Sequence, residues 1–328
     1  MKIEIHQPLP IHEIGQRDNQ EDSLWPQPEC ATTNDRLFIV CDGMGGHAKG
    51  EVASQTVCTA LGDWFKNNII PDESFTDAQL QDALAFAYEE LDKKDDGSFK
   101  RMGTTLTLLY IHRQGVTAAH MGDSRIYHIR PGDGLKYVSR DHSLVFDLFQ
   151  AGEITYEEML TFPQKNVITR AMQPGEENRT QPDIIHISDV QSGDYFYLCS
   201  DGMLERMENQ ELASILCSEK SDEEKRQQLI EATINNKDNH SAWILHIKDV
   251  IMEVGDDILF DEETVARCNA LNITPNSANE KHYINNEYDD VVIVKESPQK
   301  TSILKKLCNL LILNLRTIRI KIHATTTT

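Results

Sequence analysis

Two kinds of hydrophobic pattern occur along the chain up to about residue 248. Short runs rich in β-branched and aromatic residues, bounded by Gly, Asp or Arg, predict strands. Apolar residues that recur at helical spacing, as Val57, Leu61 and Phe65 do, predict helices. The expected strands are 37–41, 104–112, 116–121, 125–129 and 194–199, and the expected helices are 51–69, 77–94, 209–217 and 222–234.

The order of these elements indicates the fold class and the extent of the domain. Strand blocks and helix blocks alternate unevenly, which favours an α+β fold over a regular array of βαβ units. The sequence contains no internal repeat. Because the pattern changes near residue 248, we expect one domain over residues 1–248 and an extension over residues 249–328.

The extension has two parts of opposite charge. Residues 249–296 are acidic and rich in Asn, whereas residues 300–322 combine basic and apolar residues without an acid. The longest uncharged run there, 307–315, is too short to span a bilayer. The sequence leaves three roles open for 300–322: contact with an anionic membrane surface, docking to a kinase, or packing on the domain.

Composition and charge narrow the classes of partner. Of the 328 residues, 39% are hydrophobic and 26% are charged, as in an ordinary soluble protein with a core. The formal net charge of −21 at pH 7 would repel a phosphate backbone, so we expect no nucleic-acid partner. An acidic excess instead suits divalent cations.

The cysteines and the first residues indicate the compartment. The chain has seven cysteines, an odd number without a CxxC pair, and several lie in apolar runs. This pattern predicts reduced, buried thiols. The N-terminal segment has no apolar stretch long enough for a secretory signal or a membrane span. We therefore expect a cytoplasmic protein, and we expect it to be a monomer.

Four acidic clusters stand where an apolar strand gives way to Gly or another turn residue. A rigid sheet aims an Asp at a strand end, while a following Gly leaves room for an ion. Several strands can thus converge carboxylates at one rim, and such hard oxygen ligands suit Mg²⁺ or Mn²⁺. Each Asp-Gly pair alone is also an ordinary turn sequence. The clusters are Glu21-Asp22, Asp42, Asp123 and Asp201.

Taken together, the motifs resemble those of the metal-dependent type 2C serine/threonine protein phosphatases in their bacterial form. RDNQED, DGMGGH, GTT before a strand, GDSR, DHS and SDG occur in the family's order and spacing over residues 12–248. The resemblance implies a central antiparallel β-sandwich flanked by helices, in four αββα layers, with two Mn²⁺ or Mg²⁺ ions at one end. It also implies dephosphorylation of phosphoserine and phosphothreonine in proteins, by direct attack of a water that bridges the two ions.

The resemblance assigns roles to single residues. The aspartate matching Asp42 bridges both metals, and those matching Asp22 and Asp201 each bind one. The backbone carbonyl of the residue matching Gly43 adds a ligand. Arg17 matches the arginine that binds the substrate phosphate, and a bidentate guanidinium suits phosphate geometry.

A further ligand is expected from an Asp that opens the last strand of the domain. Two candidates are Asp238, in KDNHSAWILHIK, and Asp289, in EYDDVVIVKE. We prefer Asp238, because it follows the expected helix 222–234, precedes an apolar strand and keeps the Asn that usually accompanies this Asp. Asp289 stays the alternative.

Two neighbouring segments also have alternative interpretations. Asp123 matches the position of a weaker third metal in many bacterial members, and a turn ion-paired by Arg125 is the alternative. Residues 141–172 resemble the mobile flap beside the site. Asp141 in that segment is either a ligand or, as we prefer, the cap of the next helix.

The motifs also bear on chemistry and on rival functions. Met44 stands where some members present a histidine as an acid, and this role cannot be transferred to His47. The absence of an HCxxxxxR loop disfavours a cysteine-dependent tyrosine phosphatase. The alternatives are a pseudophosphatase that binds phosphoproteins, which the retained aspartates disfavour, and a hydrolase of small phosphates. The expected partners are proteins phosphorylated by a serine/threonine kinase.

Overall fold

The structure, a computed structural model, describes most of the chain up to residue 252 and two later strands. The chain divides into two compact units, Met1–Asp256 and Asp257–Thr328. The first unit thus extends past the expected boundary at 248. The described residues are 1–45, 49–95, 97, 102–162, 167–175, 177, 179–252, 283–286 and 289–294.

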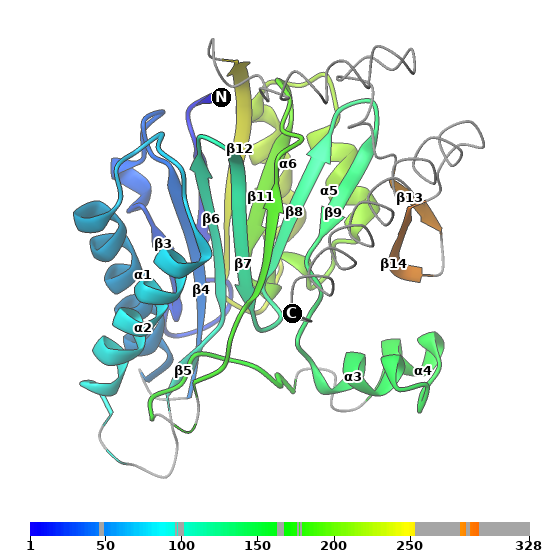
Figure 1. Cartoon of the computed structure of the whole chain (residues 1–328). Coiled ribbons are helices and arrows are strands. Elements are labelled where there is room, and N and C mark those ends of the chain that lie inside the picture. The colour runs from blue at the N-terminus through cyan, green and yellow to red at the C-terminus, as the bar shows by residue number, and fades with distance from the viewer. Residues whose placement is uncertain are drawn as a thin grey trace, which may run out of the picture. The chain divides into compact units, whose positions relative to one another are not determined.

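Two six-stranded antiparallel sheets lie at the centre of the first unit (Figure 1). One sheet contains β1 (Lys2–Ile5), β2 (Leu9–Glu13), β8 (Arg125–Arg130), β9 (Gly134–Val138), β11 (Tyr195–Cys199) and β12 (His240–Ile251). Its order is β1-β12-β11-β8-β9, and β2 also pairs with β12. The other has the order β10-β7-β6-β4-β3, with β5 on β4; its strands are β3 (Asp22–Trp25), β4 (Leu37–Met44), β5 (Gly103–Thr104), β6 (Leu106–His112), β7 (Gly115–Met121) and β10 (Asp183–Ile187).

Helices cover the outer face of each sheet. Helices α1 (Lys49–Asn68) and α2 (Asp77–Asp92) pack on the sheet that contains β4, and α5 (Asn209–Leu216) and α6 (Asp222–Thr233) pack on the other. The short helices α3 (Leu144–Gln150) and α4 (Tyr156–Thr161) lie between β9 and β10 in the chain. This helix–sheet–sheet–helix arrangement confirms the expected α+β sandwich.

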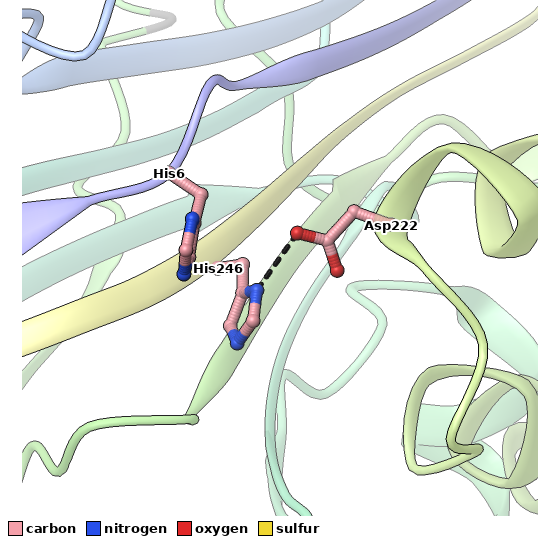
Figure 2. A group of neighbouring side chains, drawn as sticks. All are labelled: His6, Asp222 and His246. Atoms are coloured by element: carbon pink, nitrogen blue, oxygen red, sulfur yellow. Dashed lines mark hydrogen bonds and ion pairs between the residues drawn. The ribbon is translucent and has the colours of Figure 1, made fainter.

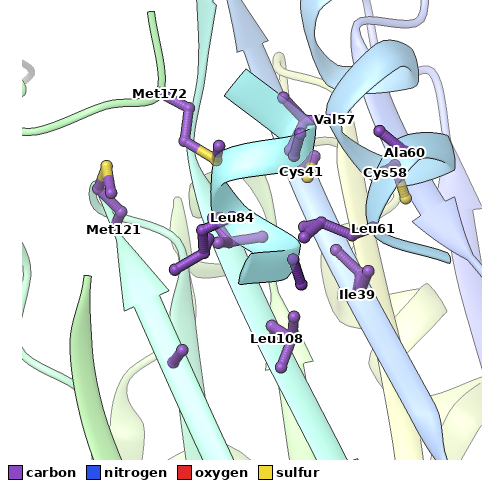
Figure 3. Packing of buried hydrophobic residues seen from close by; sticks show 14 of the residues in the cluster. Ile39, Cys41, Val57, Cys58, Ala60, Leu61, Leu84, Leu108, Met121 and Met172 are labelled. Carbon is purple, nitrogen blue, oxygen red and sulfur yellow. The ribbon is translucent and has the colours of Figure 1, made fainter. Parts of the chain in front are cut away.

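Strand β4 shows why the central strands were recognisable in the sequence. Ile39 and Cys41 face α1 and α2, where they lie close to Leu61 (Figure 3). Phe38 and Val40 face the opposite sheet. Because successive strand residues point to opposite faces, a strand covered on both sides is apolar throughout. The run LFIVC therefore predicted a strand correctly, although β4 continues to Met44.

The edge strands were not predicted. All five residues of β9 are half-buried, and β10 contains only exposed and half-buried residues. Such strands lack the continuous apolar run of a central strand. The predicted helices, in contrast, differ from α1, α2, α5 and α6 by at most two residues at either end. Helical spacing is readable because each of these helices buries one face against a sheet.

The cysteines correct one expectation. Cys41, Cys58 and Cys199 are free and buried, as predicted, whereas Cys217 is half-buried and Cys30 is exposed. Cys30 ends a short 3-10 turn that contains no buried residue, so its thiol is not covered by the core. Cys268 and Cys308 lie outside the described residues. Within the described part of the chain, no helix is long and apolar enough to cross a membrane.

The second unit contributes one described hairpin. Strands β13 (Tyr283–Asn286) and β14 (Asp289–Val294) pair antiparallel. Asp289 thus opens a strand, as its sequence suggested. The basic and apolar segment 300–322 lies outside the described residues.

Gly62 on α1 allows the helix to approach the sheet at Trp25. A Cβ atom at position 62 would lie 2.2 Å from the indole ring of Trp25. We expect Gly62→Ala to lower the free energy of unfolding by about 1–3 kcal/mol through overpacking. Helix propensity alone would change it by about 1 kcal/mol in the opposite direction. Urea unfolding measures the sign, and the cost should shrink in a Trp25→Leu background; an equal cost in both backgrounds would contradict the steric explanation.

Candidate metal centre

Asp22 and Asp42 are brought together by the pairing of β3 with β4. The two residues are direct cross-strand partners, so their side chains lie on the same face of the sheet, with Cβ atoms about 5 Å apart. Asp22 is buried, and its Oδ2 accepts a hydrogen bond of 2.8 Å from the Ser200 hydroxyl. Its Oδ1 is buried and has no hydrogen-bond partner.

The GTT motif holds the backbone of Asp42. The Asp42 amide donates to Thr105 Oγ1 at 3.0 Å, and the Asp42 carbonyl accepts from the Thr105 amide and the Thr104 hydroxyl at 2.9 Å each. These contacts interrupt the single strand predicted over 104–112, which divides into β5 and β6 around Thr105. The interruption at Thr105 therefore fixes the end of β4 that carries the Asp42 carboxylate.

Gly43 lies where β4 passes the start of α1. A Cβ atom at this position would lie 2.1 Å from the Gly50 carbonyl oxygen and 2.7 Å from the Glu21 carbonyl oxygen. The Gly43 amide donates to that same Glu21 oxygen at 3.1 Å. Only glycine fits this approach without moving the backbone. Gly43, the glycine of the DG pair, therefore allows the segment that carries Asp42 to pack against the segment that carries Glu21 and Asp22.

Asp201 and Asp238 approach the site from the other sheet. Asp201 begins a 3-10 turn after β11, and Asp238 lies just before β12. The Asn236 side chain, which is buried, joins these two segments by donating to the Gly202 carbonyl at 2.7 Å. Since β11 and β12 are paired, their acidic ends lie at the same edge of the sandwich.

Asn239 ties the N-terminal motif to this edge. Its Oδ1 accepts from the Glu21 amide at 2.8 Å, and its Nδ2 donates to the carbonyls of Ile14 and Asn19 at 2.8 and 2.9 Å. The Asn of the Asp-Asn pair thus shapes the loop that carries Arg17. The pair was visible in the sequence, but this use of its side chain was not.

Arg17 reaches the acidic edge directly. Its Nη2 donates to Asp238 Oδ2 at 2.6 Å, and this hydrogen bond raises the pKa of the guanidinium further, with smaller contributions from Glu21 and Asp42. The Arg17 side chain is 55% exposed. A cation that is held beside the carboxylates and is open to solvent is suited to bind an incoming anion.

Asp123 follows β7 and joins the same group. Its Oδ1 is buried without a hydrogen-bond partner. The alternative of a turn ion-paired by Arg125 is not what the structure shows, because Arg125 Nε and Nη2 donate to the two oxygens of Asp141 at 2.6 Å each. Asp141 is therefore not the helix cap that we preferred. Ser143 caps α3 instead, accepting from the Phe146 amide at 3.4 Å.

Asp22, Asp42, Asp123 and Asp201 perturb one another. Burial, with smaller contributions from Asp201 and Asp238, raises the pKa of Asp22 to about 7 against hydrogen bonds from Ser241 and Ser200. Burial followed by the other carboxylates also raises the pKa of Asp42 well above its usual range. The pKa values of Asp123 and Asp201 rise to about 7 and 6, again first through burial. Such a cluster favours either protonation or a bound cation.

The donor set fits divalent cations. The unpartnered Oδ1 atoms of Asp22 and Asp123 are buried acceptors, which are costly unless something supplies positive charge. All side-chain donors are carboxylate oxygens, which suit Mg²⁺ or Mn²⁺. The structure thus brings together every residue predicted to bind metal: Asp22, Asp42, Gly43, Asp123, Asp201 and Asp238.

The segment expected to form a flap is anchored at its ends. The Leu144 amide donates to the Val167 carbonyl at 2.8 Å, and the Thr169 amide donates to the His142 carbonyl at 2.9 Å. Phe146 is buried, so this part of the segment is packed and not exposed to solvent. His47 lies outside the described residues.

Comparisons with known proteins agree with this geometry. The model of the family described as protein phosphatase 2C matches residues 13–233. A putative protein phosphatase 2C-type of Streptococcus pyogenes is 35% identical over 196 residues, which are 60% of this chain and 78% of the relative. The serine/threonine phosphatase stp of Listeria welshimeri is 30% identical over 230 residues, which are 68% of this chain and 88% of the relative.

Solved structures share the fold. The serine/threonine phosphatase PstP/Ppp of Mycobacterium tuberculosis has a TM-score of 0.65 at 28% identity and covers 75% of this chain and 100% of its own. A catalytic domain of PstP in complex with two manganese ions has a TM-score of 0.62 at 29% identity, with 76% and 100% covered. The matched family and these structures confirm the resemblance seen in the motifs. The chain belongs to the protein phosphatase 2C family of phosphatases.

Proposed function

We propose that the first unit is the catalytic domain of a metal-dependent phosphatase that removes phosphate from phosphoserine and phosphothreonine in proteins. The observation that carries this proposal is the convergence of carboxylates, two of them with a buried and unpartnered oxygen, beside the half-exposed Arg17. The relatives that are named protein or serine/threonine phosphatases support it.

Each acidic residue has a distinct place in this proposal. Asp42 lies opposite Asp22 and is perturbed by Asp201, Asp123 and Asp238, so it is the residue we assign to bridge two cations. Asp22, Asp201 and Asp238 complete the two sites, with the Gly43 carbonyl, and Asp123 would hold a weaker third ion. Bound Mn²⁺ or Mg²⁺ supplies Lewis acidity and lowers the pKa of a coordinated water.

Arg17 binds and orients the phosphate in this scheme. Its guanidinium is directed to the acidic edge by Asp238, and its loop is shaped by Asn239. Two parallel N–H donors match two phosphate oxygens, which fixes the direction in which the phosphorus atom faces the carboxylates. Met44 cannot donate a proton to the leaving oxygen, so the acid must be another group or water.

Metal dependence tests the proposal. The full-length chain is treated with EDTA and then assayed on a phosphothreonine peptide with Mn²⁺ or Mg²⁺ added back. We expect no turnover in EDTA and restored turnover with either cation. Folded protein that binds the phosphopeptide but does not turn it over with either cation would instead support a phosphoprotein-binding module, which was the alternative drawn from the sequence.

Arg17→Lys should raise KM for the phosphopeptide about tenfold, with a smaller change in kcat. The reason is the loss of one charge-assisted hydrogen bond, worth roughly 1.5 kcal/mol, while the positive charge remains. Steady-state kinetics measure both constants. Arg36→Lys is the matched control, because Arg36 binds Asp72 at 2.9 Å through the same kind of contact. An unchanged KM in Arg17→Lys would remove Arg17 from phosphate binding.

A further inference from the structure

A second group of metal-binding side chains lies in the first unit, away from the acidic centre. His6 follows β1, His246 is in β12 and Asp222 begins α6. The His6 amide donates to the His246 carbonyl at 2.9 Å, so the two residues are neighbours across paired strands. His246 lies six residues beyond His240 along β12, which is about 20 Å in an extended strand. The two metal-binding regions are therefore separate.

The three side chains converge (Figure 2). The rings of His6 and His246 stack with their centroids 4.4 Å apart, and His246 Nδ1 lies 2.7 Å from Asp222 Oδ2. One ligand atom from each residue lies within 4.8 Å of the others. Tetrahedral zinc with bonds of about 2.0–2.1 Å needs its ligand atoms about 3.4 Å apart. Because His6 is exposed, its side chain can rotate toward the ion, while the hydrogen-bonded atoms of His246 and Asp222, 2.7 Å apart, would separate as zinc replaces the proton between them.

The chemistry of the three side chains suits a metal. Two imidazoles and one carboxylate form the mixed nitrogen and oxygen set that binds Zn²⁺, in contrast to the all-oxygen acidic centre.

A surrounding shell orients two of the ligands. The Tyr195 hydroxyl donates to Asp222 Oδ1 at 2.5 Å, and the Tyr195 ring stacks on His246 with centroids 4.2 Å apart. The buried Lys225 ammonium donates to the Tyr195 hydroxyl oxygen at 2.8 Å. Hydrogen bonds and packing of this kind fix the direction of the side chains that contact a metal, and they tighten metal binding.

A comparable group elsewhere in the first unit already contains a cationic side chain. His120, His142 and Asp183 are also close together. There, however, Arg170 Nη1 lies 3.3 Å from His142 Nε2 and 2.8 Å from Asp183 Oδ1, so a guanidinium already supplies the positive charge. The His120 Nε2 is engaged by the Arg140 carbonyl at 2.7 Å.

We propose that His6, His246 and Asp222 bind one Zn²⁺ ion, with a fourth position left to water. The ion would link the end of β1 to β12 and α6. It would stabilise the folded first unit in proportion to the logarithm of the zinc concentration above its Kd. This role is independent of phosphate hydrolysis.

Zinc stoichiometry tests the proposal. The full-length chain and its variants His6→Gln and His246→Gln are dialysed to equilibrium against micromolar Zn²⁺, and bound zinc is measured by elemental analysis. Any zinc at the acidic centre is common to all three proteins, so the difference isolates this site. We expect each variant to bind one equivalent less than wild type, and zinc to raise the wild-type Tm more than the Tm of His6→Gln.

His186→Gln is the matched control, because His186 also lies beside a carboxylate, Asp77 at 2.9 Å, but belongs to no group of three possible metal ligands among the described residues. It should bind as much zinc as wild type. Equal stoichiometry in wild type and His6→Gln would overturn the proposal, as would a loss confined to His246→Gln, since either result excludes His6 as a ligand. The exposed position of His6 keeps this variant folded, and its zinc-free Tm verifies that.

Discussion

Asp42→Asn should lower phosphatase activity by about 100-fold or more while leaving the fold intact. Loss of a group that only supports a metal ligand already costs about 10–100-fold in metal affinity or activity, and Asp42 is assigned to bridge two ions. Asn has nearly the same shape, and the backbone contacts of Asp42 with Thr104 and Thr105 do not involve its carboxylate. Turnover of a phosphothreonine peptide at saturating Mn²⁺ measures the effect.

The same substitution should raise stability in the absence of metal. Asp42 is half-buried and lies close to Asp22, Asp201, Asp123 and Asp238, so removing its charge relieves both the partial burial of a carboxylate and the repulsion between carboxylates. Thermal unfolding in EDTA should therefore give a Tm equal to or above that of wild type. Asp133→Asn, at an exposed turn where Asp133 pairs with Lys136, should change neither activity nor Tm. Full activity in Asp42→Asn would exclude the bridging role.

Asp194→Ala should be the most destabilising of the substitutions considered, at about 3–5 kcal/mol. Asp194 is fully buried and accepts from Arg130 Nε at 2.7 Å and from His128 Nε2 at 2.9 Å. Removing it leaves the largely buried Arg130 guanidinium without its main counter-charge. Urea unfolding measures the loss. In a domain of this size it corresponds to a fall in Tm of roughly 6–20 °C.

A matched control lies on the same arginine. Asp189 pairs with Arg130 at 3.1 Å, but its side chain is 61% exposed, so Asp189→Ala should cost less than about 1 kcal/mol. Although burial acts to raise it, hydrogen bonds from Arg130 and His128 lower the pKa of Asp194 below 3.8. Its contribution is therefore full above that pH and is lost as pH falls through the lowered pKa. The gap between wild type and Asp194→Ala should narrow in acid; similar costs for both variants at pH 7 would contradict this account.

The part of the site that could be predicted consists of residues whose position is evident from the sequence around them. Asp42 lies near the end of β4 and Asp201 comes just after β11, and in both strands a continuous apolar run that is buried on both faces leads to the acid. Gly43 was recognisable for the same reason. Where burial is only partial, as in β9 and β10, the pattern was too weak to predict a strand.

The remaining part depends on contacts between distant segments. The pairing of Arg17 with Asp238 joins residues 221 positions apart, and Asn239 reaches Ile14 across 225 positions. Local periodicity contains no information about such pairs. The wrong prediction of the residue that caps α3 has a different origin. Asp141 and Ser143 are both acceptable helix caps, and only the position of Arg125 decides between them.

The pairing of β12 with both β1 and β2 has a consequence for biosynthesis. On a translating ribosome, the segment that carries Arg17 emerges long before the Asp238–Asn239 pair that holds it. Until β12 leaves the exit tunnel, Asp22 and Asp42 can come together through the pairing of β3 and β4. The loop that carries Arg17 and the turn at Asp201, however, still lack the residues that hold them in place. A nascent or truncated chain that ends before residue 240 is therefore expected to be catalytically silent, so phosphatase activity begins only when the first unit has been synthesised in full.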